Sequence, residues 1–339
     1  MQCQTIKKVL MRKFLILVLL SALFVLSVQA QDSAQFKPSG KIFGLLFTDV
    51  HTTFSGGDKV SGFEITRSYL GFDFSFSKTI MSRVMYDGMT QTVNGKIMSI
   101  GYLRNAFLQY DNGRLILRGG LIGAEQVSMA DKFWNYRYIT KPAVDYSGMV
   151  YSVDLGFIAK YRIIDEVTVD IGLLNGKGYK DVAIDTALKF VSGITFNPAK
   201  NIMFRGYYDI MGSGSDKQMT FSVTGAYMGP VFSIGAEYLM QNNHNRIAGE
   251  DYSGISIFSA VRVAEKFSLF ARYDNLGSVI VDGETDPWNL GKDGTNLFIG
   301  FDYSPVKNVR ISPNFIWFTP DDTAADNTGT VGLNVEARF

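Results

Sequence analysis

One segment in the middle of the chain shows a regular alternation of hydrophobic and polar positions. From Tyr151 to Tyr161 every second residue is apolar or aromatic, whereas the positions between them include Asp154 and Lys160. Successive side chains of a β-strand point to opposite faces, so this pattern predicts a strand with one apolar and one polar face. The terminal tyrosines suit a membrane interface, because their rings can lie in lipid and their hydroxyls among headgroups.

The same alternation recurs along most of the chain after residue 40. Many of the alternating segments are close to the ~9–11 residues that a tilted strand needs to cross a bilayer. The register of the third and fourth segments is ambiguous from the pattern. The alternation predicts sixteen strands, at 41–54, 62–76, 79–91, 101–110, 113–121, 150–161, 166–175, 184–196, 200–211, 217–228, 231–241, 254–263, 266–277, 295–304, 307–318 and 329–339.

The connections between these strands alternate in length. Tight turns such as Gly229-Pro230 follow every second strand, and longer polar segments such as 55–61, 92–100 and 122–149 follow the others. Short turns on one side and long loops on the other are typical of an antiparallel up-and-down transmembrane β-barrel. We therefore predict an all-β chain that forms a barrel of about sixteen strands, with the short turns and both termini on the periplasmic side.

A soluble β-sandwich or β-propeller would also show alternation and turns. No repeat of ~40–45 residues, the length of a propeller blade, occurs in the chain. The polar faces carry charges of both signs along many consecutive strands, which suits a water-filled lumen better than a surface in bulk water. The membrane barrel is therefore favoured.

The first 30 residues have the composition of a secretory signal peptide. Four basic residues precede an apolar run from Phe14 to Val28, and Val28-Gln29-Ala30 offers a small-residue cleavage site. We expect residues 1–30 to be removed and residues 31–339 to form the barrel. The single cysteine, Cys3, lies in the leader, so the remainder can form no disulfide and no cysteine-ligated metal site.

Composition excludes two classes of protein. Without the leader the chain has 29 basic residues (33 less 4) against 32 acidic ones, a net charge of −3, which excludes a nucleic-acid binder by charge. After the leader no run of ~18 apolar residues occurs, so membrane-spanning helices are not expected. A membrane barrel remains compatible with a mean hydropathy of only +0.06, because its strands are apolar at alternate positions.

Three short motifs carry a resemblance to a known family. They are Ile65-Thr66-Arg67-Ser68-Tyr69-Leu70-Gly71-Phe72, Leu103-Arg104-Asn105-Ala106-Phe107-Leu108-Gln109-Tyr110 and Leu117-Arg118-Gly119-Gly120-Leu121-Ile122-Gly123. Together with Leu173-Leu174-Asn175-Gly176, they resemble the porin O and P type (phosphate-selective porin-like) of outer-membrane channels, best over residues 62–180. The resemblance implies a porin of sixteen to eighteen strands that passes small polar solutes by diffusion, often as a homotrimer. Phosphate selectivity is not implied, because the long third outer loop lacks a lysine cluster.

That loop, 122–149, is the strongest candidate for a pore constriction. Sixteen strands enclose a lumen too wide for the side chains of the wall to fill, so a selective channel needs something to narrow it. Loops of this length are usually functional or disordered, and the segment Phe133-Trp134-Asn135-Tyr136-Arg137-Tyr138 is too aromatic for disorder. We expect the loop to fold into the lumen, although packing on a neighbouring loop or subunit is the alternative. The candidate constriction residues are Lys132, Arg137, Lys141, Glu125, Asp131 and Asp145.

Charged residues at inward positions form the expected lumen wall. The principal ones are Arg67, Arg114, Arg118, Asp154, Lys160 and Arg205. Walls of opposite sign would set up a transverse field, but most of these charges are expected to pair across strands. Arg67, Arg114 and Arg118 are the best candidates for facing the constriction, because their strands precede the long loop.

Nothing in the sequence forms a convincing catalytic constellation. Of the two histidines, only His244, with Glu250 and Asp251 nearby, could belong to one, and no cofactor or metal is expected. We therefore predict a non-enzymatic porin in the bacterial outer membrane. Its partners would be outer-membrane lipid, small polar solutes and the barrel-assembly machinery, whose signal the terminal Phe339 resembles. The alternative is a non-channel barrel that acts in structure or adhesion through its outer loops.

Overall fold

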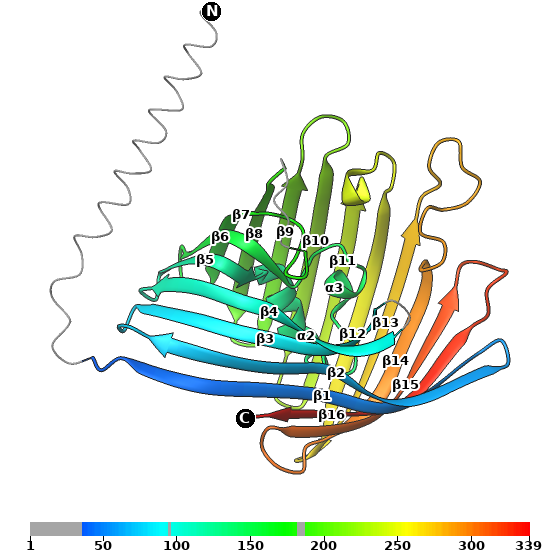
Figure 1. Ribbon diagram of the computed structural model, residues 1–339, viewed down its shortest axis with the longest axis horizontal. Coiled ribbons are helices and arrows are strands. Elements are labelled where there is room, and N and C mark those ends of the chain that lie inside the picture. Colours follow the sequence, from blue (N-terminus) through cyan, green and yellow to red (C-terminus); the bar gives the residue numbers. More distant parts are fainter. Residues whose placement is uncertain (1–35, 94–95, 182–186) are drawn as a thin grey trace, which may run out of the picture.

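The computed structural model describes residues 36–93, 96–181 and 187–339, and these residues form a closed antiparallel β-barrel (Figure 1). The expected signal peptide, residues 1–30, lies outside the described residues. Each strand pairs with its neighbours in sequence, and β1 pairs with β16, so the sheet has no free edge. Closure satisfies the backbone hydrogen bonds of every strand within the wall, which a sheet surrounded by lipid requires.

Sixteen strands are present in the described part of the chain, as the alternation predicted. Two helices, α2 and α3, lie between β5 and β6. The strands are β1 (Ser39–Ser55), β2 (Asp58–Ser75), β3 (Ile80–Val93), β4 (Lys96–Asp111), β5 (Leu115–Gly123), β6 (Val153–Arg162), β7 (Val167–Leu174), β8 (Lys189–Ala199), β9 (Ile202–Met211), β10 (Gln218–Met228), β11 (Phe232–Asn242), β12 (Tyr252–Ala264), β13 (Phe267–Ser278), β14 (Gly294–Tyr303), β15 (Val309–Pro320) and β16 (Thr328–Arg338), and the helices are α2 (Glu125–Trp134), α3 (Ala143–Tyr146) and the 3-10 turn η1 (His244–Arg246).

Two outer connections are shorter than the sequence predicted. The polar segment 55–61 was expected to be a loop, but β1 and β2 continue through it and join at Gly56-Gly57. Both glycines have positive φ, at 56° and 92°, which a two-residue hairpin turn favours and other residues adopt with strain. Likewise β4 begins at Lys96, within the expected loop 92–100. Glycine and polar residues suggested loops here, but the hairpin pairing continues through them.

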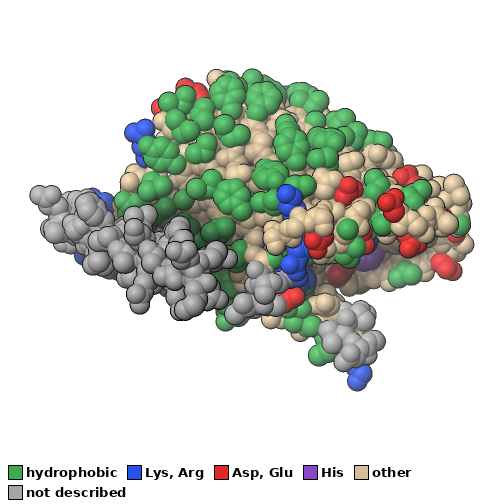
Figure 2. All heavy atoms as spheres, turned by 90° about the horizontal axis from the view of Figure 1, so that it is seen from above, with side chains coloured by type: hydrophobic (Ala, Val, Ile, Leu, Met, Phe, Trp, Pro, Cys, Tyr) green, Lys and Arg blue, Asp and Glu red, His purple; other side chains and the backbone are tan. Residues whose placement is uncertain are grey.

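The outer face of the barrel is apolar. Along β12, Ile255 and Ile257 are exposed on the outside, whereas the intervening Ser256 is buried on the inside. The same alternation runs through β7 to β16, and in Figure 2 hydrophobic side chains cover the convex surface at the top of the view. Exposed apolar area on this scale is stable only against lipid, so the barrel spans a membrane, and barrels of this kind belong to the bacterial outer membrane.

The long connection between β5 and β6 packs against the inner face of the barrel wall. Phe133, Trp134, Tyr136 and Tyr138 of this connection are buried in one cluster with aromatic residues of β12, β13 and β14. A second cluster joins Val127, Ala130 and Val144 of the same connection to the inner faces of β6, β8 and β11. Among the described residues, no helix is long and apolar enough to cross a bilayer.

A charge on the outer face should destabilise the barrel, whereas a charge on the inner face should not. Ile257 lies on the outer face near the middle of β12, so Ile257→Arg should lower the free energy of unfolding by about 2–4 kcal/mol. The matched control is Ser268→Arg on β13, whose side chain borders an inner cavity, with an expected change within about 1 kcal/mol. Urea unfolding in lipid vesicles, followed by tryptophan fluorescence, measures both. Equal losses would contradict the assignment of faces.

Candidate pore constriction

The connection between β5 and β6 folds into two helical pieces, and its sequence explains where each begins and ends. Helix α2 begins directly after β5 and ends at Asn135, which adopts the left-handed conformation with φ 59°. Asparagine tolerates this conformation better than most residues and commonly terminates helices. Helix α3 begins after Pro142, whose fixed φ suits the start of a helix. We call residues 124–152 the inner loop.

Hydrogen bonds fix the inner loop against the lumen wall. Arg205 Nε of β9 donates to Gln126 Oε1 at 2.9 Å, and Gln126 Nε2 donates to Glu237 Oε1 of β11 at 3.2 Å. At the other end of α2, Tyr138 donates its hydroxyl to Asp302 Oδ1 of β14 at 2.6 Å. These bonds show that the loop lies inside the barrel, as the sequence analysis expected.

Arginine side chains of the wall also donate hydrogen bonds to backbone carbonyls of the inner loop. Arg310 Nη1 donates to the Asn135 carbonyl and Arg272 Nη1 to the Lys141 carbonyl, each at 2.6 Å. A backbone carbonyl accepts equally well whatever side chain its residue carries, so these two arginines fix the path of the loop rather than its surface. No hydropathy pattern could indicate such contacts.

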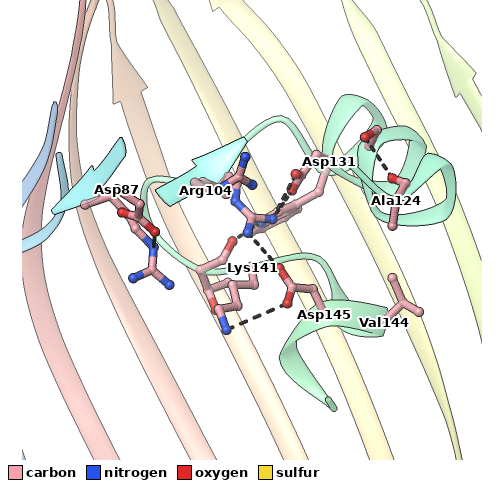
Figure 3. Close-up of polar contacts among 12 residues, drawn as sticks. Asp87, Arg104, Ala124, Asp131, Lys141, Val144 and Asp145 are labelled. Atoms are coloured by element: carbon pink, nitrogen blue, oxygen red, sulfur yellow. Dashed lines mark hydrogen bonds and ion pairs between the residues drawn. The ribbon is translucent and has the colours of Figure 1, made fainter. Parts of the chain in front are cut away.

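Within the inner loop, Arg137 links the two helical pieces, and Figure 3 labels its two partners, Asp131 and Asp145. Its guanidinium donates to Asp131 at 2.8 Å and to Asp145 at 2.7 Å, and Lys141 Nζ lies 3.7 Å from Asp145. Burial raises the pKa of the Asp131 carboxyl, while the neighbouring Arg137 acts to lower it. Four predicted constriction residues are thus brought together in one network.

The remaining two predicted constriction residues lie apart from this network. Glu125, at the start of α2, accepts from Lys160 Nζ at 2.8 Å and from Arg118 Nη1 at 3.3 Å. Burial acts to raise the pKa of Glu125, but the two cations outweigh burial and hold the pKa below its usual value. Lys132 is exposed on α2. Through Glu125, the inner loop therefore forms ion pairs with the wall residues Arg118 and Lys160.

The other predicted wall residues are placed as follows. Arg67 lies 3.9 Å from the buried Asp87, and Arg205 donates to Asp170 at 2.7 Å. Asp154 accepts from the backbone N–H groups of Leu155 and Gly176, each at 2.8 Å, rather than from an arginine or lysine. Apart from Asp154, these charges pair across the wall.

Arg114 requires a correction. It was predicted on a strand facing the constriction, but it lies exposed in the turn between β4 and β5. Its guanidinium donates to the carbonyls of Arg162 and Ile163 and lies 5.3 Å from the ring of the outward-facing Tyr161. The strand begins two residues later than predicted, at Leu115, because Asn112 caps the turn with its side chain.

Four further residues lie near the Arg137 network, although none of them was predicted to be a constriction or lumen-wall residue. Asp87 of β3 accepts from the Tyr179 hydroxyl at 2.6 Å, and Lys180 Nζ lies 3.0 Å from Met89 Sδ. The guanidinium of Arg104 on β4 lies 5.0 Å from the ring of Tyr69, and its positive charge acts to lower the pKa of Asp131. Figure 3 shows Asp87 and Arg104 on the wall strands beside the helices of the inner loop.

The sequence pattern could have indicated only some of these four residues. Asp87 and Arg104 lie on the third and fourth strands, whose register the alternation left ambiguous, and the pairing of these two strands contains a bulge beside Met85 and Tyr86. A bulge shifts the alternation by one residue, so faces cannot be assigned by counting. Tyr179 and Lys180 belong to the connection between β7 and β8, and nothing in its composition indicates that it reaches β3.

Cavities lie on both sides of the inner loop. One of about 530 Å³ is bordered by Lys141, Asp145 and residues near the long connections, including Lys292. Another of about 800 Å³ is bordered by Asn135, Tyr136 and the short turns at 265–266 and 304–308. The inner loop therefore lies between these two cavities, one on the side of the long connections and one on the side of the short turns.

The suspected catalytic set around His244 is not assembled. Its imidazole Nδ1 lies 2.5 Å from Gln241 Oε1, and the ring stacks on Trp288 at 5.1 Å. The Asp251 carboxylate instead accepts from Asn242 and from the Asn243 backbone. Burial lowers the pKa of the His244 imidazole, and the nearby cations Lys292 and Lys189 act in the same direction.

No family model matches the chain, and no curated protein matches its sequence. Solved structures are nevertheless similar in fold. They include the outer-membrane channel DcaP of Acinetobacter baumannii (TM-score 0.66, 12% identity, covering 90% of this chain and 99% of that one) and the anion-selective porin from Comamonas acidovorans (0.64, 10%, 89% and 100%). OmpT, an outer membrane protein of Vibrio cholerae, in its trimer form, is also similar (0.64, 15%, 90% and 100%). These likenesses establish the fold of an outer-membrane porin-type barrel.

Removal of the buried Arg205 should destabilise the barrel strongly. Its side chain is 1% exposed and donates to Asp170, Thr195 and Gln126, so Arg205→Met leaves the Asp170 carboxylate buried without a cation. We expect a loss of about 3–5 kcal/mol in the free energy of unfolding. Adding Asp170→Leu should restore about 2 kcal/mol or more, because the unpaired charge is then gone.

The matched control for this prediction is Arg114→Met, at the exposed turn, with an expected change within about 0.5 kcal/mol. Urea unfolding of the folded protein in detergent measures all four proteins. Equal effects of the two arginine substitutions would contradict the role given to the buried network.

Proposed function

We propose that this protein is an outer-membrane porin that lets small hydrophilic solutes diffuse through its lumen. The observation that carries the proposal is the inner loop, which is fixed inside the barrel and presents Asp131, Arg137, Lys141 and Asp145 between two cavities. A barrel that serves only as a membrane anchor has no need for a charged constriction.

Charges on the inner loop and on the facing wall strands support passage of polar rather than apolar solutes. Arg67 and Arg104 lie on the wall strands β2 and β4, and the inner loop carries Asp131 and Asp145; Figure 3 shows Arg104 beside these two carboxylates. Opposed charges of this kind set up a transverse field in which oriented water is favourable and its replacement by apolar groups is not. The field would act as a filter against apolar solutes of the same size.

Separate observations support the finer parts of the proposal. The motifs around Arg67, Arg104 and Arg118 favour the porin O and P type, and the trimer form of the structurally similar Vibrio cholerae protein favours a homotrimer. Phe339 pairs with Gly44 through two backbone hydrogen bonds and exposes its ring on the outside, where the barrel-assembly machinery could read it. The proposed role is transport without catalysis.

Substitution of a loop charge should change ion selectivity. The Lys141 side chain is 42% exposed and lies beside Asp145, so Lys141→Glu makes this part of the inner loop more acidic. We expect the cation-to-anion permeability ratio to rise by about twofold or more, since the local field sets counter-ion concentration. Reversal potentials across planar bilayers under a salt gradient measure this ratio.

The control is Arg114→Glu, which makes the same change of charge at a periplasmic turn away from the inner loop. We expect no shift in its reversal potential. An unchanged reversal potential for Lys141→Glu would overturn the assignment of the inner loop as the constriction. If the unmodified protein forms no channels in the bilayer, the porin proposal itself fails, and a structural or adhesive barrel becomes the better account.

A further inference from the structure

Strands β1 and β2 place three side chains with metal-ligating atoms on the lumen wall, away from the constriction network. Asp49 and His51 are two residues apart on β1, so they share a face, and they lie opposite Asn334 and Gly332 of β16. Asn334 donates to the carbonyl of Tyr138 in the inner loop, which identifies this face as the inner one.

Glu64 of β2 completes the group. It lies directly opposite Asp49 in the β1–β2 pairing. Its neighbours Phe63 and Ile65 are exposed on the outer face at 88% and 48%, so alternation directs Glu64 inward. The three residues therefore meet on one face of two adjacent strands, and both strands are rigid parts of the wall rather than loops.

The ligand atoms are close to the spacing that a metal ion requires. His51 Nδ1 lies 2.7 Å from Asp49 Oδ1, and one ligand atom from each of the three residues lies within 4.8 Å of the other two. Ligand atoms that bind one zinc ion at about 2.1 Å lie about 3.4 Å apart. A change in the torsions of the Glu64 side chain, the longest of the three, can shorten the wider separations, and the ion would replace the proton that His51 and Asp49 share at 2.7 Å.

The charge at this place is not balanced as it is elsewhere in the lumen. Most inner carboxylates have an arginine or lysine within 4 Å, as Asp170 has Arg205 and Asp302 has Arg310. Among the described residues, neither Asp49 nor Glu64 has an arginine or lysine at that distance. Two carboxylates opposite each other on paired strands repel, so a bound cation would relieve a destabilising contact.

We propose that Asp49, His51 and Glu64 form a binding site for a divalent transition-metal ion on the lumen wall. One imidazole nitrogen and two carboxylate oxygens suit Zn²⁺, whereas Mg²⁺ and Ca²⁺ favour ligand sets made of oxygen alone. The His51 side chain is 27% exposed, so an ion reaches the site from the water inside the barrel, and further positions on the ion stay open to water. The site does not depend on the proposed function as a channel.

The test is calorimetric titration of the folded, untagged protein in detergent with ZnCl₂, after treatment with a chelator. We expect one Zn²⁺ per chain, with affinity lowered at least about tenfold in His51→Ala and in Glu64→Gln. Glu64→Gln keeps the size of the side chain and so tests the site even if the histidine variant does not fold. A tenfold excess of Mg²⁺ should not displace Zn²⁺.

The matched control is His244→Ala, which removes the other histidine and should leave Zn²⁺ binding unchanged. Far-UV circular dichroism confirms that each variant is folded before titration. The proposal is overturned if the unmodified protein binds no Zn²⁺, if Glu64→Gln binds it as tightly, or if Mg²⁺ competes equally. Because binding is measured without a membrane, this result is independent of whether the protein conducts ions.

Discussion

The closure of the sheet between β1 and β16 is the constraint on which the rest of the structure depends. A strand surrounded by lipid cannot leave its N–H and C=O groups unpaired, and only a closed sheet pairs all of them. Eleven residue pairs join β1 to β16, from Leu45 opposite Arg338 to Ser55 opposite Thr328. Closure fixes which face of each strand meets lipid, and therefore which side chains are left to line the lumen.

The inner loop follows from the size of that lumen. Sixteen strands enclose a space that wall residues cannot fill, and here aromatic residues of the inner loop pack against Phe258, Phe270 and Phe298 of the wall. Two buried arginines also attach the loop to the wall. Arg205 and Arg272 are each 1% exposed, and their hydrogen bonds join the loop to β9 and β13. Apolar packing holds the loop in place, and the arginine hydrogen bonds decide its path.

Much of the fold could be predicted because its signal is local. The alternation in segments such as 151–161 depends only on lipid outside and polar contacts inside, so strand number and most strand bounds follow from the sequence. The extent of the β1–β2 hairpin could not be predicted, since Gly56-Gly57 is compatible with either a loop or a tight turn. Arg114 was misplaced for a similar reason, because a capping asparagine delays the start of β5.

The candidate site was predictable only in part. Arg137, Asp131 and Asp145 lie within one loop, so their proximity in sequence indicated their proximity in space. Asp87, Tyr179 and the cluster of Asp49, His51 and Glu64 depend on strand register and on contacts between distant segments, which composition does not encode. Bulges interrupt the regular alternation close to Glu64 in β1–β2 and close to Asp87 in β3–β4.

The central claim is a wall with lipid on one side and water on the other, and residues 31–339 contain no cysteine to interfere with its test. Single cysteines at successive positions 254–259 of β12, labelled with a fluorophore in vesicles of brominated lipid, report which medium each position faces. We expect quenching by lipid at 255, 257 and 259, and quenching by neither lipid nor iodide at 256 and 258, whose positions are buried on the inside against the inner loop. Uniform quenching by iodide along the segment, with none by lipid, would contradict the account.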